Sequence, residues 1–255
     1  MNDRARTIIA TSLKMYFDHD ETVSWAEEIR LIAENHPAVR SGEIEVIIFP
    51  NFTSIPKLVE LYEKSPVAVG AQNMAALPYG ALTGEVNAPS LRQVGCDFVE
   101  LGHVERHRYF HETRDDVAQK VSTAVVHNLI PLVCIGEPNP VTEHEAAQWC
   151  ISDIGKITRS VEAASPERMI FAYEPEWAIG AEKPADASYI RAVTTQIGDW
   201  LSTQPSLRNA DVIYGGSAGP GLLTELNGAV SGLFLGRFAH DPAAFAQILD
   251  EAAAS

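Results

Sequence analysis

The chain has 255 residues, 46% of them hydrophobic, and is therefore long enough to bury a large core. Its formal net charge of −15 argues against sequence-independent binding to nucleic acid or to an anionic membrane surface. Its three cysteines lack metal-ligand spacing, its first residues lack a signal-peptide pattern, and no segment reaches membrane-spanning length, so we expect reduced thiols in a cytoplasmic protein.

Short apolar runs alternate with longer amphipathic stretches along the whole chain. The pattern predicts strands at 7–13, 44–49, 67–71, 98–101, 132–135, 169–173, 212–214 and 233–235, and helices near 22–36, 53–64, 88–95, 114–128, 142–163, 187–202, 221–227 and 242–253. Eight strand–helix units favour a closed parallel barrel over an open doubly wound sheet. Since no linker divides the chain, we expect one α/β domain, a (β/α)8 TIM barrel over residues 1–255.

Polar residues gather where the predicted strands end. In a parallel barrel these carboxyl ends and the following loops form one mouth, where catalytic groups are found. The sequence thus predicts a lysine, a histidine and a glutamate around a common opening. The residues at these positions are Ser12, Lys14, Gln72, Asn73, His103, Glu105, Glu137, Glu174, Ser217 and Arg237.

The segment 172–183 is the most informative of these strand ends. Glu174 directly follows a predicted buried strand and precedes a loop that contains Pro175, Trp177 and Gly180. A carboxylate beside a stiff, closable flap suits proton abstraction that must be shielded from water. A lone glutamate at a strand end is about equally often a salt-bridged structural residue, and the flap is what favours the catalytic interpretation.

His103 and Lys14 are the candidate partners of this base. His103 could be an ordinary hydrogen-bonded histidine, but just before a helix it would stay neutral and could donate to a carbonyl oxygen. Lys14 could be a simple loop cation, but at the mouth it would attract an anion and stabilise negative charge on oxygen.

Glycines at the last two strand ends predict a phosphate site. The segments 214–217 and 236–237 follow the seventh and eighth strands, the loops that present amides to phosphate in many barrels. A lone Gly-Gly-Ser usually marks a tight turn, but two such loops together with Gly180 in the flap favour a phosphate site. Gly180, Ser217 and Gly236 are the candidate contacts. No Rossmann fingerprint, P-loop or HExxH motif is present, so we expect neither a nucleotide cofactor nor a metal. Together the groups indicate a small phosphorylated carbonyl compound whose α-proton is moved.

At these residues the chain resembles the triosephosphate isomerase family over nearly its whole length. The resemblance implies that Glu174 moves the proton, that His103 polarises the enediolate oxygens, and that Lys14 supplies positive charge. It also implies Glu105, Glu137 and Trp177 as supporting residues, and a homodimer formed through the loop from Gln72 to Glu85, which carries Thr83 toward the partner's site. The matching blocks are 50–53, 70–73, 80–85, 101–103, 134–137, 172–175, 177–180 and 214–217.

Departures from the family pattern concentrate at the mouth. Ser12 stands where the family has asparagine, Val104 where it has serine, and Arg237 where it has glycine, and the flap tip 180–183 differs at two positions. Ser12 frees space beside the reacting carbons, which a substrate with one extra hydroxymethyl group would use. These variants are similar to isomerases of tetritol catabolism that interconvert L-erythrulose 1-phosphate and D-erythrulose 4-phosphate.

Three rival interpretations accompany this leading hypothesis. The first is triosephosphate isomerase activity itself, with glyceraldehyde 3-phosphate and dihydroxyacetone phosphate as substrates. The second is a non-catalytic phosphosugar-binding protein, against which the joint presence of Glu174, His103 and Lys14 argues. The third is a Schiff-base aldolase, which is disfavoured because Lys14 matches a charge-stabilising residue of the family.

Overall fold

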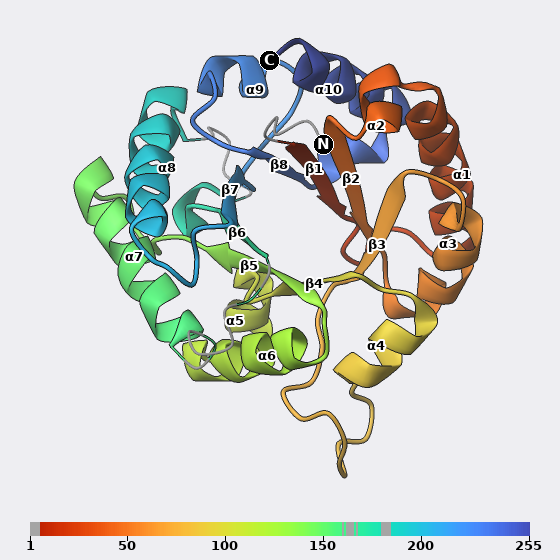
Figure 1. Ribbon diagram of the computed structural model, residues 1–255, viewed down its shortest axis with the longest axis horizontal. Coiled ribbons are helices and arrows are strands. Elements are labelled where there is room, and N and C mark those ends of the chain that lie inside the picture. Colours follow the sequence, from red (N-terminus) through yellow and green to blue (C-terminus); the bar gives the residue numbers. More distant parts are fainter. Residues whose placement is uncertain (1–5, 160, 162–165, 167, 180–184) are drawn as a thin grey trace.

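Eight parallel strands form one closed barrel in this computed structural model, and each strand pairs with its neighbours in chain order (Figure 1). The structure describes residues 6–159, 161, 166, 168–179 and 185–255. The strands are mostly apolar because helices cover the outer face of the sheet and side chains fill its interior. They are β1 (Thr7–Ser12), β2 (Ile44–Phe49), β3 (Val67–Ala71), β4 (Phe98–Leu101), β5 (Ile130–Ile135), β6 (Met169–Tyr173), β7 (Ala210–Tyr214) and β8 (Gly232–Leu235).

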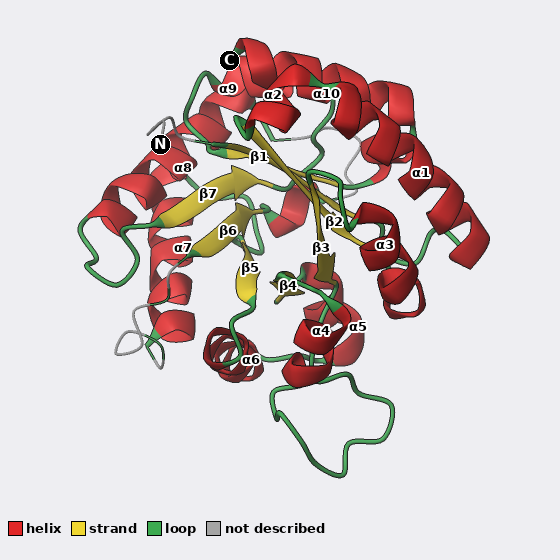
Figure 2. Ribbon diagram, turned by 45° about the vertical axis from the view of Figure 1, so that its right-hand side comes forward, coloured by secondary structure: helices red, strands yellow, loops and turns green. Residues whose placement is uncertain are grey.

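Helices cover the outside of the barrel (Figures 1 and 2). Three of them begin with a capping box, in which Asp18, Thr113 or Thr142 exchanges hydrogen bonds with an acidic residue three positions later. The helices are α1 (His19–Asn35), α2 (Pro37–Ser41), α3 (Ile55–Tyr62), α4 (Ala88–Val94), α5 (Val104–Phe110), α6 (Arg114–Val126), α7 (Glu143–Thr158), α8 (Ala187–Ser202), α9 (Leu222–Leu226) and α10 (Pro242–Ala254), with short 3-10 turns at η1 (Phe52–Ser54), η3 (Glu176–Ala178) and η4 (Arg237–His240).

The apolar core has two layers that the strands separate. Alternate strand residues such as Ile8, Phe98 and Ile170 point into the barrel and pack together there. The intervening residues, such as Ile9 and Val99, pack outward against the helices. At the carboxyl ends of the strands the inward-facing positions become polar, and this change positions the mouth.

The observed elements confirm the predicted barrel. Every predicted strand is present, although β5 and β7 begin two residues earlier than predicted. The predicted helix 142–163 is wrong at its end, since α7 stops at Thr158. The helix α2 was not predicted; it is short, starts at Pro37 and ends before Gly42, whose φ of 80° few other residues adopt. Within the described residues, no helix is both long and apolar enough to cross a membrane.

The connection between β3 and α4 projects far from the barrel (Figures 1 and 2). Its tip exposes three large apolar side chains, those of Leu77, Tyr79 and Leu82. Thr83 lies on the same projection and is exposed.

Candidate active site

The mouth of the barrel holds a pocket of about 470 Å³. It brings together Lys14, His103 and Glu174 with the loops that follow β7 and β8. A cavity of similar volume, about 460 Å³, lies at the opposite end of the barrel, between the starts of β2 and β3. Because the chemistry of such barrels occurs at the carboxyl ends of the strands, the mouth pocket is the candidate active site. Its lining includes Ser12, Lys14, His103, Glu105, Glu174, Ile179, Gly215, Gly216, Ser217, Gly236 and Arg237.

Glu174 follows β6 and is almost completely buried, with 4% of its surface exposed. Its backbone N–H donates to the carbonyl of Ile135 at 2.7 Å, which fixes where the side chain leaves the strand. Gly215 packs so closely that a Cβ there would lie 2.5 Å from the Glu174 carboxylate, so a larger residue at this position would displace that side chain. Burial raises the pKa of Glu174 well above 4.5, although the nearby Lys14 opposes the shift. The carboxylate is thus a dry and comparatively strong base.

His103 is the N-cap of α5, and its ring lies opposite Glu174. The backbone N–H of Glu105 donates to Nδ1 at 3.1 Å, so Nδ1 is the acceptor and the hydrogen of the neutral ring sits on Nε2. Nε2 lies 3.6 Å from Oε2 of Glu174. Burial, reinforced by Lys14, lowers the pKa of His103 to about 4. A neutral imidazole that can donate a hydrogen bond therefore faces a buried base.

Lys14 reaches the same site from the loop after β1. Its Nζ donates to Oε1 of Glu105 at 2.7 Å. Burial alone would lower the pKa of Lys14. The hydrogen bond and charge of Glu105, together with the charges of Glu174 and Glu100, outweigh burial, so the net shift of this pKa is upward and the side chain stays charged. The backbone of Lys14 has a φ of 51°, a strained value for a residue other than glycine. The side-chain amide of Gln72 holds this turn by donating to the Lys14 carbonyl at 2.9 Å.

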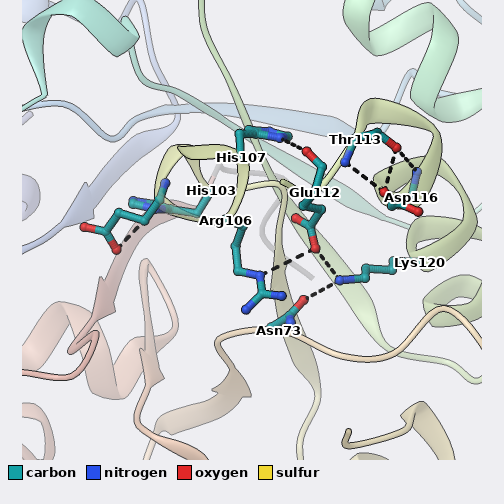
Figure 3. Close-up of polar contacts among 9 residues, drawn as sticks. Asn73, His103, Arg106, His107, Glu112, Thr113, Asp116 and Lys120 are labelled. Carbon is teal, nitrogen blue, oxygen red and sulfur yellow. Dashed lines mark hydrogen bonds and ion pairs between the residues drawn. The ribbon is translucent and has the colours of Figure 1, made fainter. Parts of the chain in front are cut away.

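A buried ionic network fixes the helix that His103 caps (Figure 3). Glu112 binds Lys120 of α6 and lies 3.5 Å from Nε of Arg106 on α5. Lys120 also donates to the side chain of Asn73 at 2.9 Å. This network joins α5, α6 and the loop after β3, and so fixes the position of the helix that begins directly after His103.

Glu137 lies behind the flap rather than in the pocket lining. It accepts hydrogen bonds from Nε1 of Trp177 at 2.7 Å and from the hydroxyls of Tyr173 and Tyr189 at 2.9–3.2 Å. The contact anchors the first turn of the flap to the barrel. Gly180, Ala181 and Glu182 lie outside the described residues.

The predicted phosphate loops face the same pocket. Ser217 and Gly236 lie on neighbouring loops of its lining, after the adjacent strands β7 and β8, and the exposed Arg237 borders it as well. Thr83 does not contribute to the mouth of its own chain among the described contacts, since it lies on the projecting β3–α4 connection.

Sequence reasoning missed several polar residues at this end of the barrel, including Tyr16, Arg108 and Tyr109 of the pocket lining and the buried Glu100. Glu100 lies inside the barrel on β4, 3% exposed, and accepts a hydrogen bond from Ser12 at 2.7 Å. The signal was a single charged residue within the apolar run of residues 98–101. Within the described residues, no group of three or more His, Cys, Asp or Glu side chains could hold a metal ion.

We expect the acid limb of the pH dependence of kcat/KM to lie above the ordinary carboxylate range. A base must be deprotonated to act, so activity should fall as the pH drops through the raised pKa of Glu174. His103, with a pKa of about 4, is already neutral in that range and should add no limb near neutrality. Initial rates across roughly pH 4 to 9 test this, and an acid limb at the value of a free glutamate would contradict it.

Comparison with known proteins identifies similar sequences over almost the whole barrel. A sequence model of the triosephosphate isomerase family matches residues 7–252. The L-erythrulose-1-phosphate isomerase of Pectobacterium atrosepticum is 42% identical over 256 residues, covering 99% of this chain and 97% of the relative. The protein of the same description from Brucella abortus is 38% identical and covers 94% of each chain. A triosephosphate isomerase from Clostridium tetani is 35% identical over 224 residues and covers 86% of each.

Proposed function

This chain belongs to the triosephosphate isomerase family and is a phosphosugar isomerase, and we propose that it converts L-erythrulose 1-phosphate to D-erythrulose 4-phosphate. The observation that carries the reaction class is the buried, neutral imidazole of His103 at 3.6 Å from the dry carboxylate of Glu174. The choice of substrate is based on Ser12 at the end of the first strand and on the names of the two more similar relatives described above. The proposed catalytic unit is one domain that spans residues 1–255 and acts in the cytoplasm without a cofactor.

The proposed mechanism moves one proton between adjacent carbons. Glu174 removes the proton from C3 while His103 donates a hydrogen bond from Nε2 to the C2 carbonyl oxygen. The resulting enediolate is stabilised by the charge of Lys14. His103 passes a proton between the C2 and C3 oxygens, and Glu174 returns its proton to C2. The carbonyl then lies at the former C3, and no oxidant or reductant is needed.

Ser12 supports a four-carbon substrate over a three-carbon one. It lines the pocket at the end of β1, where its short side chain leaves room beside the reacting carbons. L-erythrulose 1-phosphate differs from dihydroxyacetone phosphate by one hydroxymethyl group on the carbon that loses the proton. The four-carbon substrate therefore needs additional space at this position.

Triosephosphate isomerase activity is the second candidate, because the same base and acid would serve it and one relative bears that name. Values of kcat/KM for both substrates on the purified enzyme decide between them. We expect L-erythrulose 1-phosphate to be the better substrate. A much faster reaction with glyceraldehyde 3-phosphate would overturn the proposal, and the absence of solvent-hydrogen exchange into either substrate would favour a non-catalytic binding protein.

The phosphate is proposed to bind between the loops after β7 and β8, near the amides of Ser217 and Gly236, with Gly180 of the flap as a third contact. Arg237 borders the same region and adds a positive charge. Replacement Arg237→Gly should raise KM by about tenfold, the scale of one charge-assisted hydrogen bond, and change kcat much less. Steady-state kinetics measure both constants.

Arg208→Gly is a matched control for that experiment. Arg208 is also exposed but lies between α8 and β7, at the opposite end of the barrel. The substitution Arg208→Gly should leave KM unchanged. An equal rise in KM for both variants, or none for Arg237→Gly, would mean that the guanidinium of Arg237 does not contact the phosphate.

A homodimer is proposed to form through the loop from Gln72 to Glu85. The exposed apolar side chains at its tip support this, because such a group is costly to leave in water. In the dimer Thr83 would approach the partner's mouth. Sedimentation at several protein concentrations tests the assembly, and a monomer at all concentrations would exclude it.

A further inference from the structure

Glu100 is a buried carboxyl group to which the mechanism above gives no role. It lies on β4 two residues after Phe98, on the strand face that points into the barrel, and only 3% of its surface is exposed. Apolar side chains fill the layers of the barrel interior beneath it. An ionisable group in such surroundings is costly unless a specific partner satisfies it.

The partner of Glu100 is Ser12. Oγ of Ser12 donates to Oε2 of Glu100 at 2.7 Å, between strands on different sides of the barrel. Ser12 lines the mouth pocket, whereas Glu100 is not among the described residues of that lining. Glu100 therefore lies directly beneath the pocket floor and can affect a ligand through Ser12.

The direction of this hydrogen bond decides what Ser12 offers to a ligand. A hydroxyl group has one hydrogen and two lone pairs. When the hydrogen is committed to the Glu100 carboxylate, Ser12 presents only acceptor capacity to the pocket. A ligand hydroxyl can then donate to it, whereas a ligand carbonyl or phosphate oxygen cannot.

We propose that Glu100 is a positioning residue that fixes Ser12 as the acceptor for the terminal hydroxyl group of the four-carbon substrate. The inference rests on the proposed function, since triose phosphates lack this hydroxymethyl group. Glu100 and Ser12 thus form one recognition unit, in which Ser12 contacts the substrate and Glu100 sets the direction of its hydrogen.

The protonation state of Glu100 determines whether Ser12 is held as a hydrogen-bond acceptor toward the pocket. Burial raises the pKa of Glu100 to about 7, while the Ser12 hydrogen bond and the charge of Lys14 act in the opposite direction and Glu105 adds to the rise. Glu174, directly after β6, and Cys134 on β5 are further titratable groups that interact with it among the described residues. Above this pKa the carboxylate can only accept from Ser12; below it, the acid can donate, and the hydroxyl of Ser12 can turn toward the pocket.

The test compares kcat/KM for L-erythrulose 1-phosphate and glyceraldehyde 3-phosphate in several variants. Ser12→Ala and Glu100→Val should each lower the value for the tetrulose by roughly tenfold and change the value for the triose little. The double variant should be no worse than either single variant, because the two side chains act as a unit. The conservative variant Glu100→Gln keeps an acceptor and should retain most of the preference.

The ratio of the two kcat/KM values gives a second readout. Titration of Glu174 and His103 affects both substrates and cancels in the ratio. In the wild-type enzyme the preference for the tetrulose should rise as the pH increases through about 7, the pKa of Glu100. In Glu100→Gln the ratio should not vary with pH. This measurement remains decisive if Glu100→Val fails to fold.

Glu45→Gln is the matched control, since it changes a mostly buried carboxylate that pairs with Arg168 at the opposite end of the barrel. It should leave the substrate ratio unchanged at every pH. The role of Glu100 would be overturned if the variants lost kcat/KM equally for both substrates, or if the effects of Ser12→Ala and Glu100→Val on kcat/KM were additive. It would also be overturned if the wild-type ratio of the two kcat/KM values did not vary with pH. A wild-type enzyme that is inert toward the tetrulose would instead refute the proposed function itself, and the inference with it.

Discussion

Replacement Glu174→Asp should lower kcat by roughly 10²–10⁴-fold while changing KM much less, because positioned proton transfer contributes on this scale. The shorter side chain draws the carboxylate back by about one carbon–carbon bond. In the native site the carboxylate lies against Gly215 and 3.6 Å from Nε2 of His103, so little else can take its place. Steady-state kinetics with the preferred substrate measure the effect.

Glu176→Asp is the control for this experiment. Glu176 lies two residues further along the same loop, but its carboxylate is 3.7 Å from Arg114 and it does not line the described pocket. The same truncation there should leave kcat nearly unchanged. An unaltered kcat in Glu174→Asp would show that another group is the base.

Replacement Lys14→Met should lower kcat/KM by about 10²–10³-fold, the range for loss of one group that stabilises developing negative charge on oxygen. The change removes the cation that interacts with Glu105, Glu100 and Glu174. Since Lys14 lowers the pKa of Glu174, its loss should raise that pKa further. The acid limb of the pH profile should therefore move to higher pH.

Lys57→Met tests whether the loss of kcat/KM depends on the position of the lysine at the mouth of the barrel. Lys57 is an exposed lysine on α3 that pairs with Glu60, and its loss should affect neither rate nor pH profile. A Lys14→Met enzyme with a normal pH profile and a modest loss of activity would indicate that Lys14 serves as a loop cation only.

The barrel was predictable from the sequence because its determinants are local. Runs such as Ile44–Phe49 are apolar at every position except Glu45, as expected of a strand buried on both faces. The polar residues that follow these runs, including His103 and Glu174, must then lie at one end of a parallel barrel. Local pattern did not predict the end of α7 at Thr158, where the amphipathic sequence continues beyond the helix.

The hydrogen bonds and pKa values at the mouth depend on segments that are distant in the sequence, so they could not be derived from local sequence patterns. Ser12 and Glu100 are 88 positions apart, and Lys14 and Glu105 are 91 apart, yet each pair forms a short hydrogen bond. The direction of the Ser12 hydrogen depends on this pairing.

The sequence by itself determined the family, the order of the strands and which chemical groups surround the mouth, because hydrophobic periodicity and strand-end motifs are written along the chain. Only the tertiary structure decided that His103 is neutral with its hydrogen on Nε2, that Glu174 is dry, and that a carboxyl group lies beneath Ser12. The physical reason is that a pKa and a hydrogen-bond direction are set by burial and by neighbouring charges, and folding supplies both from remote parts of the chain.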